Sequence, residues 1–133
     1  MNSAYDRNAA LVRSFVDALN RHDLDDFVAL LSDDVELRTP RGIRRGRSEA
    51  AQWFEKPLDH LDLRFEQSRV LVGEDEVIGI GDLVFTWRET GEVAERLERA
   101  AIWKVGEGLI RSWEPFETPA EALRAAGILR EPE

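Results

Sequence analysis

Charged side chains within predicted strands are the strongest candidates for chemistry. Glu114 lies in the segment SWEPF, and strand alternation places it on one face with Ile110, Ser112 and Phe116. If this face lines a pocket, the removal of water raises the carboxyl pKa towards that of a useful general base. If Trp113 faces inward instead, Glu114 points into water, and alternation alone leaves both orientations open.

Arg99 is the second candidate, because it alternates with Ala101 and Trp103 in the preceding predicted strand. An inward guanidinium group could bind an anionic ligand or form a salt bridge with Glu114. In a salt bridge, Glu114 would stay ionised and its pKa would fall rather than rise. The role of Glu114 therefore depends on where Arg99 points.

Five arginines crowd into a short segment rich in glycine: Arg38, Arg41, Arg44, Arg45 and Arg47. The segment could be an anion-binding loop ahead of a helix N-terminus, or a solvated loop whose charges offset nearby acids. The two histidines, His22 and His60, lie at predicted element boundaries and are expected in solvent. Because the carboxylates are scattered and cysteine is absent, we expect no metal site and no disulfide.

The composition predicts one soluble domain that spans residues 1–133. Its hydrophobic fraction of 43% suits a globular core. The net charge of −9 repels phosphate backbones, which argues against a nucleic-acid partner. The N-terminal segment is charged where a signal peptide is apolar, and no window reaches the roughly 18 apolar residues of a membrane helix. We expect a cytoplasmic protein with no membrane partner.

Hydrophobic periodicity predicts helices in the first part of the chain. Residues 3–20 carry one apolar stripe at helical spacing. Asp23 is expected to cap a short second helix, and Ser48 to cap a third helix that ends near Pro57. Between them, residues 35–39 form a brief β-like segment.

The period changes from 3.6 to 2 near residue 61. Turn signals separate four predicted strands, at residues 61–72, 77–88, 95–105 and 109–116. Gly79 and Gly81 are natural bend points, so the antiparallel sheet is expected to curl. Thr118 and Glu121 predict the start of a short last helix that ends at Gly127. Helices that pack on one face of an antiparallel sheet define an α+β domain.

The outward face of the predicted sheet is also apolar. Ile78, Ile80 and Ile102 alternate onto it. Since a monomer tolerates a large exposed apolar patch poorly, we expect a homodimer that pairs through this face.

Two segments carry a family resemblance. VRSFVDALNRHDLDDFVALLSDDVELRTPRG and WKVGEGLIRSWEPFE are similar to parts of ketosteroid isomerases and SnoaL-like polyketide cyclases, members of the nuclear transport factor 2-like superfamily. The likeness runs from about Ala9 to Gly127. It implies a cone-shaped, curved antiparallel sheet packed on N-terminal helices, the cystatin-like roll, with an apolar pocket and frequent dimerisation. Its members include isomerases, cyclases, epoxide hydrolases and non-catalytic binding domains.

The resemblance argues against a steroid isomerase mechanism. Ketosteroid isomerases use a tyrosine, a general-base aspartate and a protonated aspartate, and the matching positions here are Phe15, Thr39 and Ala101. Phenylalanine and alanine cannot donate a side-chain hydrogen bond, and threonine is no base at neutral pH.

Cyclases and epoxide hydrolases of this fold match at one position. Both carry an aspartate on the last strand near a tryptophan, and that place is Glu114 here. The hydrolases also need an arginine two residues from an aspartate, but the candidate Asp82 is preceded at that spacing by Ile80. The alignment puts Gly81 and Phe85 on the pocket face and turns Asp82 outward, and a slip of one residue would reverse this.

The predicted pocket has a greasy wall with few polar groups. The binding residues that we expect are Phe15, Thr39, Trp53, Phe85, Arg99, Ala101, Trp103 and Ser112. The predicted function is the binding of a small apolar molecule, with cofactor-independent acid/base catalysis of isomerase, cyclase or hydrolase type by Glu114. The alternative is a non-catalytic hydrophobic-ligand-binding or dimerisation module. No cofactor is expected.

Overall fold

A computed structural model describes residues 4–39, 41–56 and 60–126. The helices are α1 (Ala4–Arg21), α2 (Leu24–Ala29), α3 (Gly46–Glu55) and α4 (Pro119–Ala125). The strands are β1 (Leu31–Thr39), β2 (Gly42–Arg45), β3 (Leu61–Val72), β4 (Glu76–Trp87), β5 (Val93–Gly106) and β6 (Leu109–Phe116). The α+β class is confirmed, and the predicted strands of the second half agree with β3 to β6 within two residues.

The helix starts follow from local capping. The Asp23 carboxylate accepts a hydrogen bond of 3.0 Å from the backbone N–H of Asp26, which caps α2 as predicted. The Thr118 hydroxyl accepts one of 3.2 Å from the Glu121 N–H and caps α4. The predicted end of this helix at Gly127 lies outside the described residues.

The arginine-rich segment is a hairpin, and its prediction as a loop is wrong. Gly42 has a φ of 116°, which lets the chain reverse from β1 into β2. The two strands pair antiparallel, with Leu37 opposite Arg44. Helix α3 then begins at Gly46, with Arg45 at the N-cap and no side-chain cap, so the predicted cap at Ser48 is also wrong.

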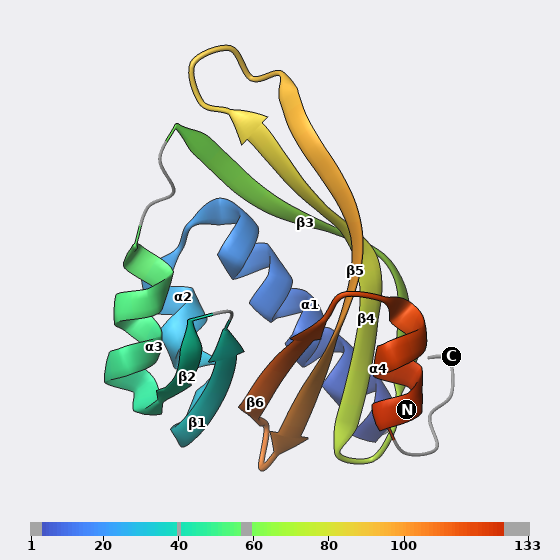
Figure 1. The fold of residues 1–133 in the computed structure, drawn as a ribbon. Helices are drawn as coiled ribbons and strands as arrows, with labels where there is room; N and C mark the ends of the chain where they lie inside the picture. The colour runs from blue at the N-terminus through green and yellow to red at the C-terminus, as the bar shows by residue number, and fades with distance from the viewer. Residues whose placement is uncertain (1–3, 40, 57–59, 127–133) are drawn as a thin grey trace.

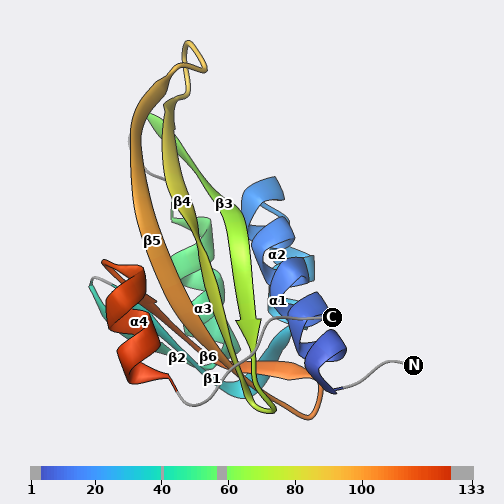
Figure 2. The same cartoon turned by 90° about the vertical axis from the view of Figure 1, so that its right-hand side faces the viewer.

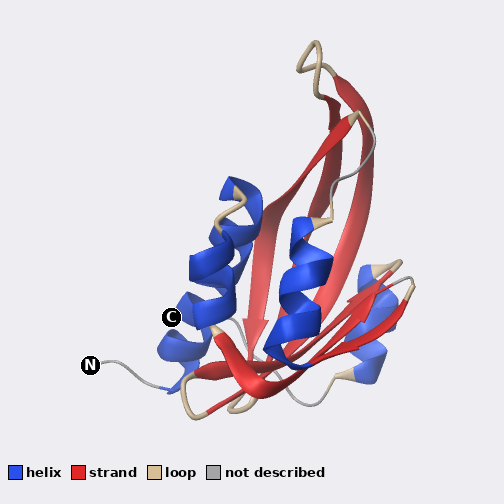
Figure 3. Ribbon diagram, turned by 90° about the vertical axis from the view of Figure 1, so that its left-hand side faces the viewer, coloured by secondary structure: helices blue, strands red, loops and turns tan. Residues whose placement is uncertain are grey.

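The six strands form one curved, unclosed sheet in the order β2-β1-β6-β5-β4-β3. All neighbours are antiparallel except β1 and β6, which run parallel with Leu37 opposite Trp113. Helices α1, α2 and α3 cover its concave face, and α4 lies on the opposite, convex face (Figures 1 and 2). Figure 3 shows the two helical layers on either side of the strands.

An extra residue between β5 and β6 decides which side chains of β6 face the helices. Ser112 is opposite Lys104, whereas Ile110 is opposite Val105, so one residue of β6 is unpaired between them. Ile110 is buried in the concave core, while Ser112 and Glu114 face the convex side. The expected shared face of Ile110 and Glu114 is therefore not present.

Each face of the sheet has its own core. The concave core includes Phe15, Phe27, Leu37, Trp103 and Ile110, and the convex core includes Leu71, Ile78, Ile80, Ala100, Ile102 and Ala122. Ala122 belongs to α4, which packs over the three isoleucines. The outer apolar face that suggested a dimer is thus covered by the chain itself, and the homodimer stays a prediction.

Candidate functional site

Aromatic side chains fill the base of the concave face. Phe15 on α1 contacts Phe27, Trp103 and Trp113, with ring centroids 5.1, 5.6 and 6.2 Å apart. Trp53 on α3 lies 5.4 Å from Trp113 by the same measure. Phe15 and Trp103 are buried, as is Ala101 beside them. These three predicted site residues form the floor of the concave face.

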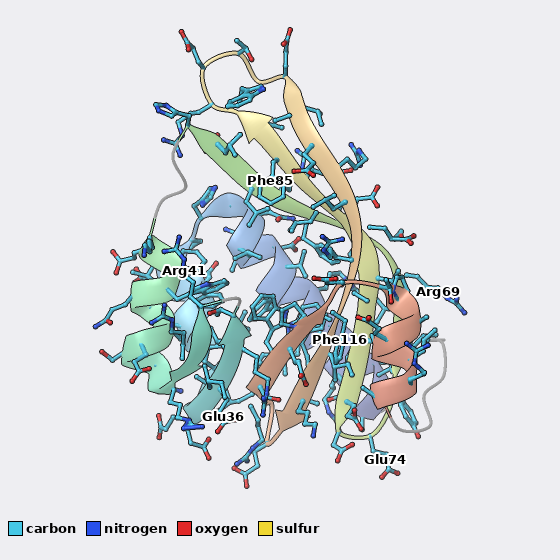
Figure 4. All side chains as sticks on the ribbon, viewed as in Figure 1. Glu36, Arg41, Arg69, Glu74, Phe85 and Phe116 are labelled. Atoms are coloured by element: carbon cyan, nitrogen blue, oxygen red, sulfur yellow. The ribbon has the colours of Figure 1, made fainter. Side chains whose placement is uncertain are left out.

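Beyond this floor, the concave face stays accessible where β3 begins, β4 ends and β5 begins. We call this part of the concave face its open end. Leu63 pairs with Phe85, and Leu83 pairs with Leu97, so all four side chains point to the same side as the buried Phe65. Each of the four is half-buried. Figure 4 shows Phe85 on this part of the sheet, above α1. The prediction that Phe85 lies on the concave side agrees with this register.

A depression of about 340 Å³ lies at the open end, between the last turns of α1 and α3 and the start of β3. Its apolar lining comprises Leu19, Trp53, Phe54, Leu61 and Leu63, and its charged or polar lining comprises His22, Glu55, Lys56, Asp62 and Arg88. Arg88 donates to Asp62 over 3.1 Å, which holds one side of the rim. We call this space the apolar depression.

A polar row crosses the concave face between the floor and the open end. Gln67 on β3 is opposite Gly81 on β4, and Gly81 is opposite Arg99 on β5. The side-chain oxygen of Gln67 is buried without a hydrogen-bond partner among the described residues. Nη1 of Arg99 donates to the carbonyl oxygens of Glu98, at 2.9 Å, and Glu117, at 3.3 Å.

Gln67 was missed by the sequence analysis, although a signal for it was present. It continues the alternation of Leu61, Leu63 and Phe65, which places it on the concave side. A bulge follows, since Arg69 is opposite Ile80 and leaves Ser68 unpaired in the register.

The convex face has a different character. A depression of about 430 Å³ is lined by Asp34, Glu36, Arg38, Asp75, Lys104, Val105, Arg111, Ser112 and Glu114. The predicted residues Ser112 and Glu114 lie here, on the side away from Phe15 and Trp103. Pro115 occupies the concave position opposite Ala101. Glu114 and Arg99 therefore lie on opposite faces of the sheet.

Asp34 and Arg111 form an exposed ion pair in this charged depression. The pKa of Asp34 is lowered, first by a hydrogen bond from the Ser32 hydroxyl and then by the charge of Arg111. Arg111 lies 3.3 Å from the Asp34 carboxylate. Such exposed pairs are worth little individually, because water and salt screen them.

Asp82 also faces the convex side, as the alignment predicted. Its carboxylate is 3.1 Å from Arg96, which contacts Glu66 at 2.7 Å. Glu66 also pairs with Arg64 on its own strand. The resulting network crosses β3, β4 and β5, so Asp82 has an ordinary structural partner.

The remaining predicted group, Thr39, belongs to the β1–β2 turn. Its hydroxyl donates to the Gly42 carbonyl over 2.7 Å and accepts from the Arg41 N–H at 3.3 Å. Arg47 is also structural, since it donates to the Leu31 carbonyl and pairs with Asp33 at 2.9 Å.

No group of three or more His, Cys, Asp or Glu side chains among the described residues is arranged to hold a metal ion. No helix within residues 4–126, so far as they are described, is long and apolar enough to cross a bilayer.

A curved sheet with helices in its concavity is the architecture of the nuclear transport factor 2-like class. Residues 12–113 match the model of the SnoaL-like domain family, and the chain belongs to that family. Comparison with curated proteins gives no match.

Solved structures show the same fold at low sequence identity. A proposed polyketide cyclase from Xanthomonas campestris is 21% identical, with a TM-score of 0.75 over 92% of this chain and 98% of that chain. A Mycobacterium tuberculosis protein in complex with estradiol-17beta-hemisuccinate is 17% identical, with a TM-score of 0.71 over 90% and 97%. An epoxide hydrolase from M. tuberculosis, described as LEH-like, is 17% identical, with a TM-score of 0.71 over 92% and 93%.

Proposed function

We propose that this protein binds a small apolar or amphipathic molecule against the open end of its concave face. The observation that carries the proposal is the half-buried apolar surface of Leu63, Leu83, Phe85 and Leu97, which adjoins the apolar depression beside Trp53. Small-molecule sites are concave and mostly apolar, with few polar groups. The steroid conjugate bound to one relative of the same fold supports a ligand of this kind.

Binding without catalysis is the form of this proposal that we favour. Phe15, Ala101 and Pro115 line the floor of the concave face and offer no acid or base. The catalytic candidate Glu114 faces the charged depression instead. A general acid or base must lie within hydrogen-bond reach of the substrate, and a molecule on the concave face is separated from Glu114 by the sheet.

Tryptophan fluorescence and thermal shift test the binding site directly. We expect members of a panel of steroids, polycyclic ketones, terpenoid epoxides and fatty acids to raise the melting temperature of the wild type. Phe85→Ala should weaken that binding on the order of tenfold, because it removes a central aromatic contact. Leu123→Ala, which alters an exposed residue of α4 on the other face, should leave affinity unchanged. Equal affinity of all three proteins would contradict the proposal.

Glu114→Gln separates binding from catalysis. The substitution should leave ligand affinity unchanged, since Glu114 lines only the charged depression among the described hollows. If the protein turns over any compound of the panel and the variant does not, Glu114 is catalytic and the convex face is the site of reaction.

A homodimer through the sheet and a cytoplasmic location stay predictions. Size-exclusion chromatography with light scattering tests the first, and a monomer mass at micromolar concentration would contradict it. Fractionation of the source cells tests the second.

A further inference from the structure

We infer that the molecule bound on the concave face carries an anionic group, a carboxylate, which Arg99 and Gln67 hold. This inference rests on the proposed function and adds the chemical class of the ligand.

The two side chains lie on one face with no side chain between them. Both are opposite Gly81, one across each of its neighbouring strands. Because adjacent strands are about 4.8 Å apart, the main chains at Gln67 and Arg99 are about 10 Å apart. Two long side chains can close this span around one carboxylate once the Arg99 guanidinium leaves the Glu117 carbonyl, which lies on the β6 side, and turns towards β4. Glycine is required between them, since a Cβ atom at Gly81 would lie 2.1 Å from the Glu66 carbonyl oxygen.

Arg99 is half-buried and has no counter-ion among the described residues. Three of the described arginines are half-buried, namely Arg44, Arg47 and Arg99. Arg47 pairs with Asp33, but no described carboxylate forms a salt bridge with Arg99 or Arg44. Arg99 instead bonds backbone carbonyls through one nitrogen. A partly desolvated cation of this kind is stabilised by an anion that completes its hydrogen bonds.

Gln67 adds a polar group that the protein itself leaves unsatisfied. Its oxygen is buried, and none of the hydrogen bonds of the described residues involves its carboxamide. A Cβ atom placed on Gly79 would lie 2.5 Å from this oxygen and 2.7 Å from the Trp103 ring. The carboxamide therefore sits beside the aromatic floor. The buried oxygen is an acceptor and cannot bind a carboxylate, so the group that would donate to the carboxylate held by Arg99 is the carboxamide NH₂.

The unsatisfied atoms gather on one side of the sheet. The buried side-chain atoms without a partner among the described residues are Nε of Arg44, Oε1 of Gln67 and Nε1 of Trp103. Arg44 is opposite the buried Leu37, and Trp103 is opposite Trp113, so all three residues face the concavity. A net charge of −9 would by itself repel an anion, so the half-buried Arg99 supplies the local positive charge that would attract one.

Two matched pairs of probes test the inference. Each pair has a similar apolar body with and without a carboxylate: estradiol-17beta-hemisuccinate with estradiol, and dodecanoate with dodecanol. Isothermal titration measures their affinity for the wild type and for Arg99→Met, Arg99→Lys and Gln67→Met. Arg124→Met, an exposed arginine of α4, is the control with the same change of charge.

We expect the acids to bind the wild type more tightly than their neutral partners. Arg99→Met should weaken the acids about tenfold or more and leave the neutral probes unchanged, because charge-assisted hydrogen bonds are the strong ones. Arg99→Lys should retain part of the preference, which keeps the test valid if Arg99→Met does not fold. Gln67→Met should cost a smaller factor, Arg124→Met none, and added salt should weaken only the acids.

The possible failures are distinguishable. If neutral probes bind as tightly as acids and Arg99→Met changes neither, the anionic class is wrong while the proposed binding function stands. If Arg124→Met weakens the acids as much as Arg99→Met, the effect is one of net charge and the inference fails. If no probe of either pair and no compound of the wider panel binds, the proposed function itself fails.

Discussion

At the scale of single residues, Trp103 shows how the floor of the concave face is held together. Its ring is packed edge-on against Phe15, and its indole N–H is buried without a partner among the described residues. Burial of an unsatisfied donor costs about 1–3 kcal/mol, which offsets part of what the packed ring contributes. The contribution of Trp103 to stability therefore comes from the packing of its ring and not from a hydrogen bond.

Substitution of Trp103 separates volume from hydrogen bonding. Trp103→Phe should lower the free energy of unfolding by only about 1 kcal/mol, because a small cavity replaces a ring that made no hydrogen bond. Trp103→Ala should cost about 3–5 kcal/mol. Urea denaturation measures both. A loss for the phenylalanine variant as large as that for alanine would mean that the N–H has a partner in solution.

Glu66 predicts a dependence of stability on pH. Hydrogen bonds from Arg96 and then Arg64 lower its pKa below the ordinary 4.5. A lowered folded pKa means that the stabilisation is complete above pH 4.5 and is lost as the pH falls through the folded value. Glu66→Gln should therefore lose less stability than the wild type between about pH 5 and about pH 3. Urea midpoints measure this, with Glu89→Gln at the exposed hairpin end as control.

Only part of the candidate site could be predicted from the sequence. Alternation placed Phe85 and Arg99 on the concave side, since no irregularity separates them from the buried residues of their strands. It could not orient Glu114, because the extra residue of β6 changes the phase between Ile110 and Ser112. Gln67 was overlooked because a polar residue in an alternating strand is ordinarily assigned to solvent.

At the scale of elements, close backbone approach at Gly81 controls the shape of β4. A Cβ atom there would lie 2.1 Å from the Glu66 carbonyl oxygen and 2.8 Å from Cα of Gln67. Backbone atoms cannot move aside without a change in the β3 bulge. Gly81 thus ties the curvature of the sheet to the position of Gln67.

Gly81→Ala should destabilise the protein by about 1–3 kcal/mol, in the range of overpacking in a filled core. Ligand affinity should fall as well, because Gln67 would shift. Gly79→Ala is the comparison, since its nearest neighbours are side-chain atoms of Gln67 and Trp103. Thermal unfolding and titration with dodecanoate measure both effects. An unchanged Gly81→Ala protein would contradict the described close approach.

The helices and strands could be predicted from the sequence where their apolar residues recur at a regular spacing. Helix α1 and strands β3 to β6 have clear apolar patterns and turn or capping residues at their ends. Strand β2 has four residues, Gly42–Arg45, too few to show alternation. Its existence depends on the Gly42 turn and on pairing with β1, and the parallel pairing of β1 with β6 joins segments that are far apart in the chain.

At the scale of the whole molecule, α4 decides whether the convex face is apolar or covered. Ala122 is buried against the core that contains Ile78, Ile80 and Ile102. Ala122→Glu should place a carboxylate in this core and displace α4, at a cost of a few kcal/mol. The uncovered face should then self-associate, which light scattering detects as a mass that rises with concentration. Ala120→Glu, an exposed neighbour, should behave as the wild type.

The parallel pair of β1 and β6 has a consequence for the order in which the protein can fold. Apart from its hairpin with β2, strand β1 joins the sheet only by pairing with the last strand, β6, with Leu37 opposite Trp113. Most of the chain must therefore exist before this contact can form. Contacts of large sequence separation slow folding, because the entropy of closing the loop is lost before any contact compensates it. On the ribosome, the β1–β2 hairpin can therefore join the rest of the sheet only after nearly the whole chain has been synthesised.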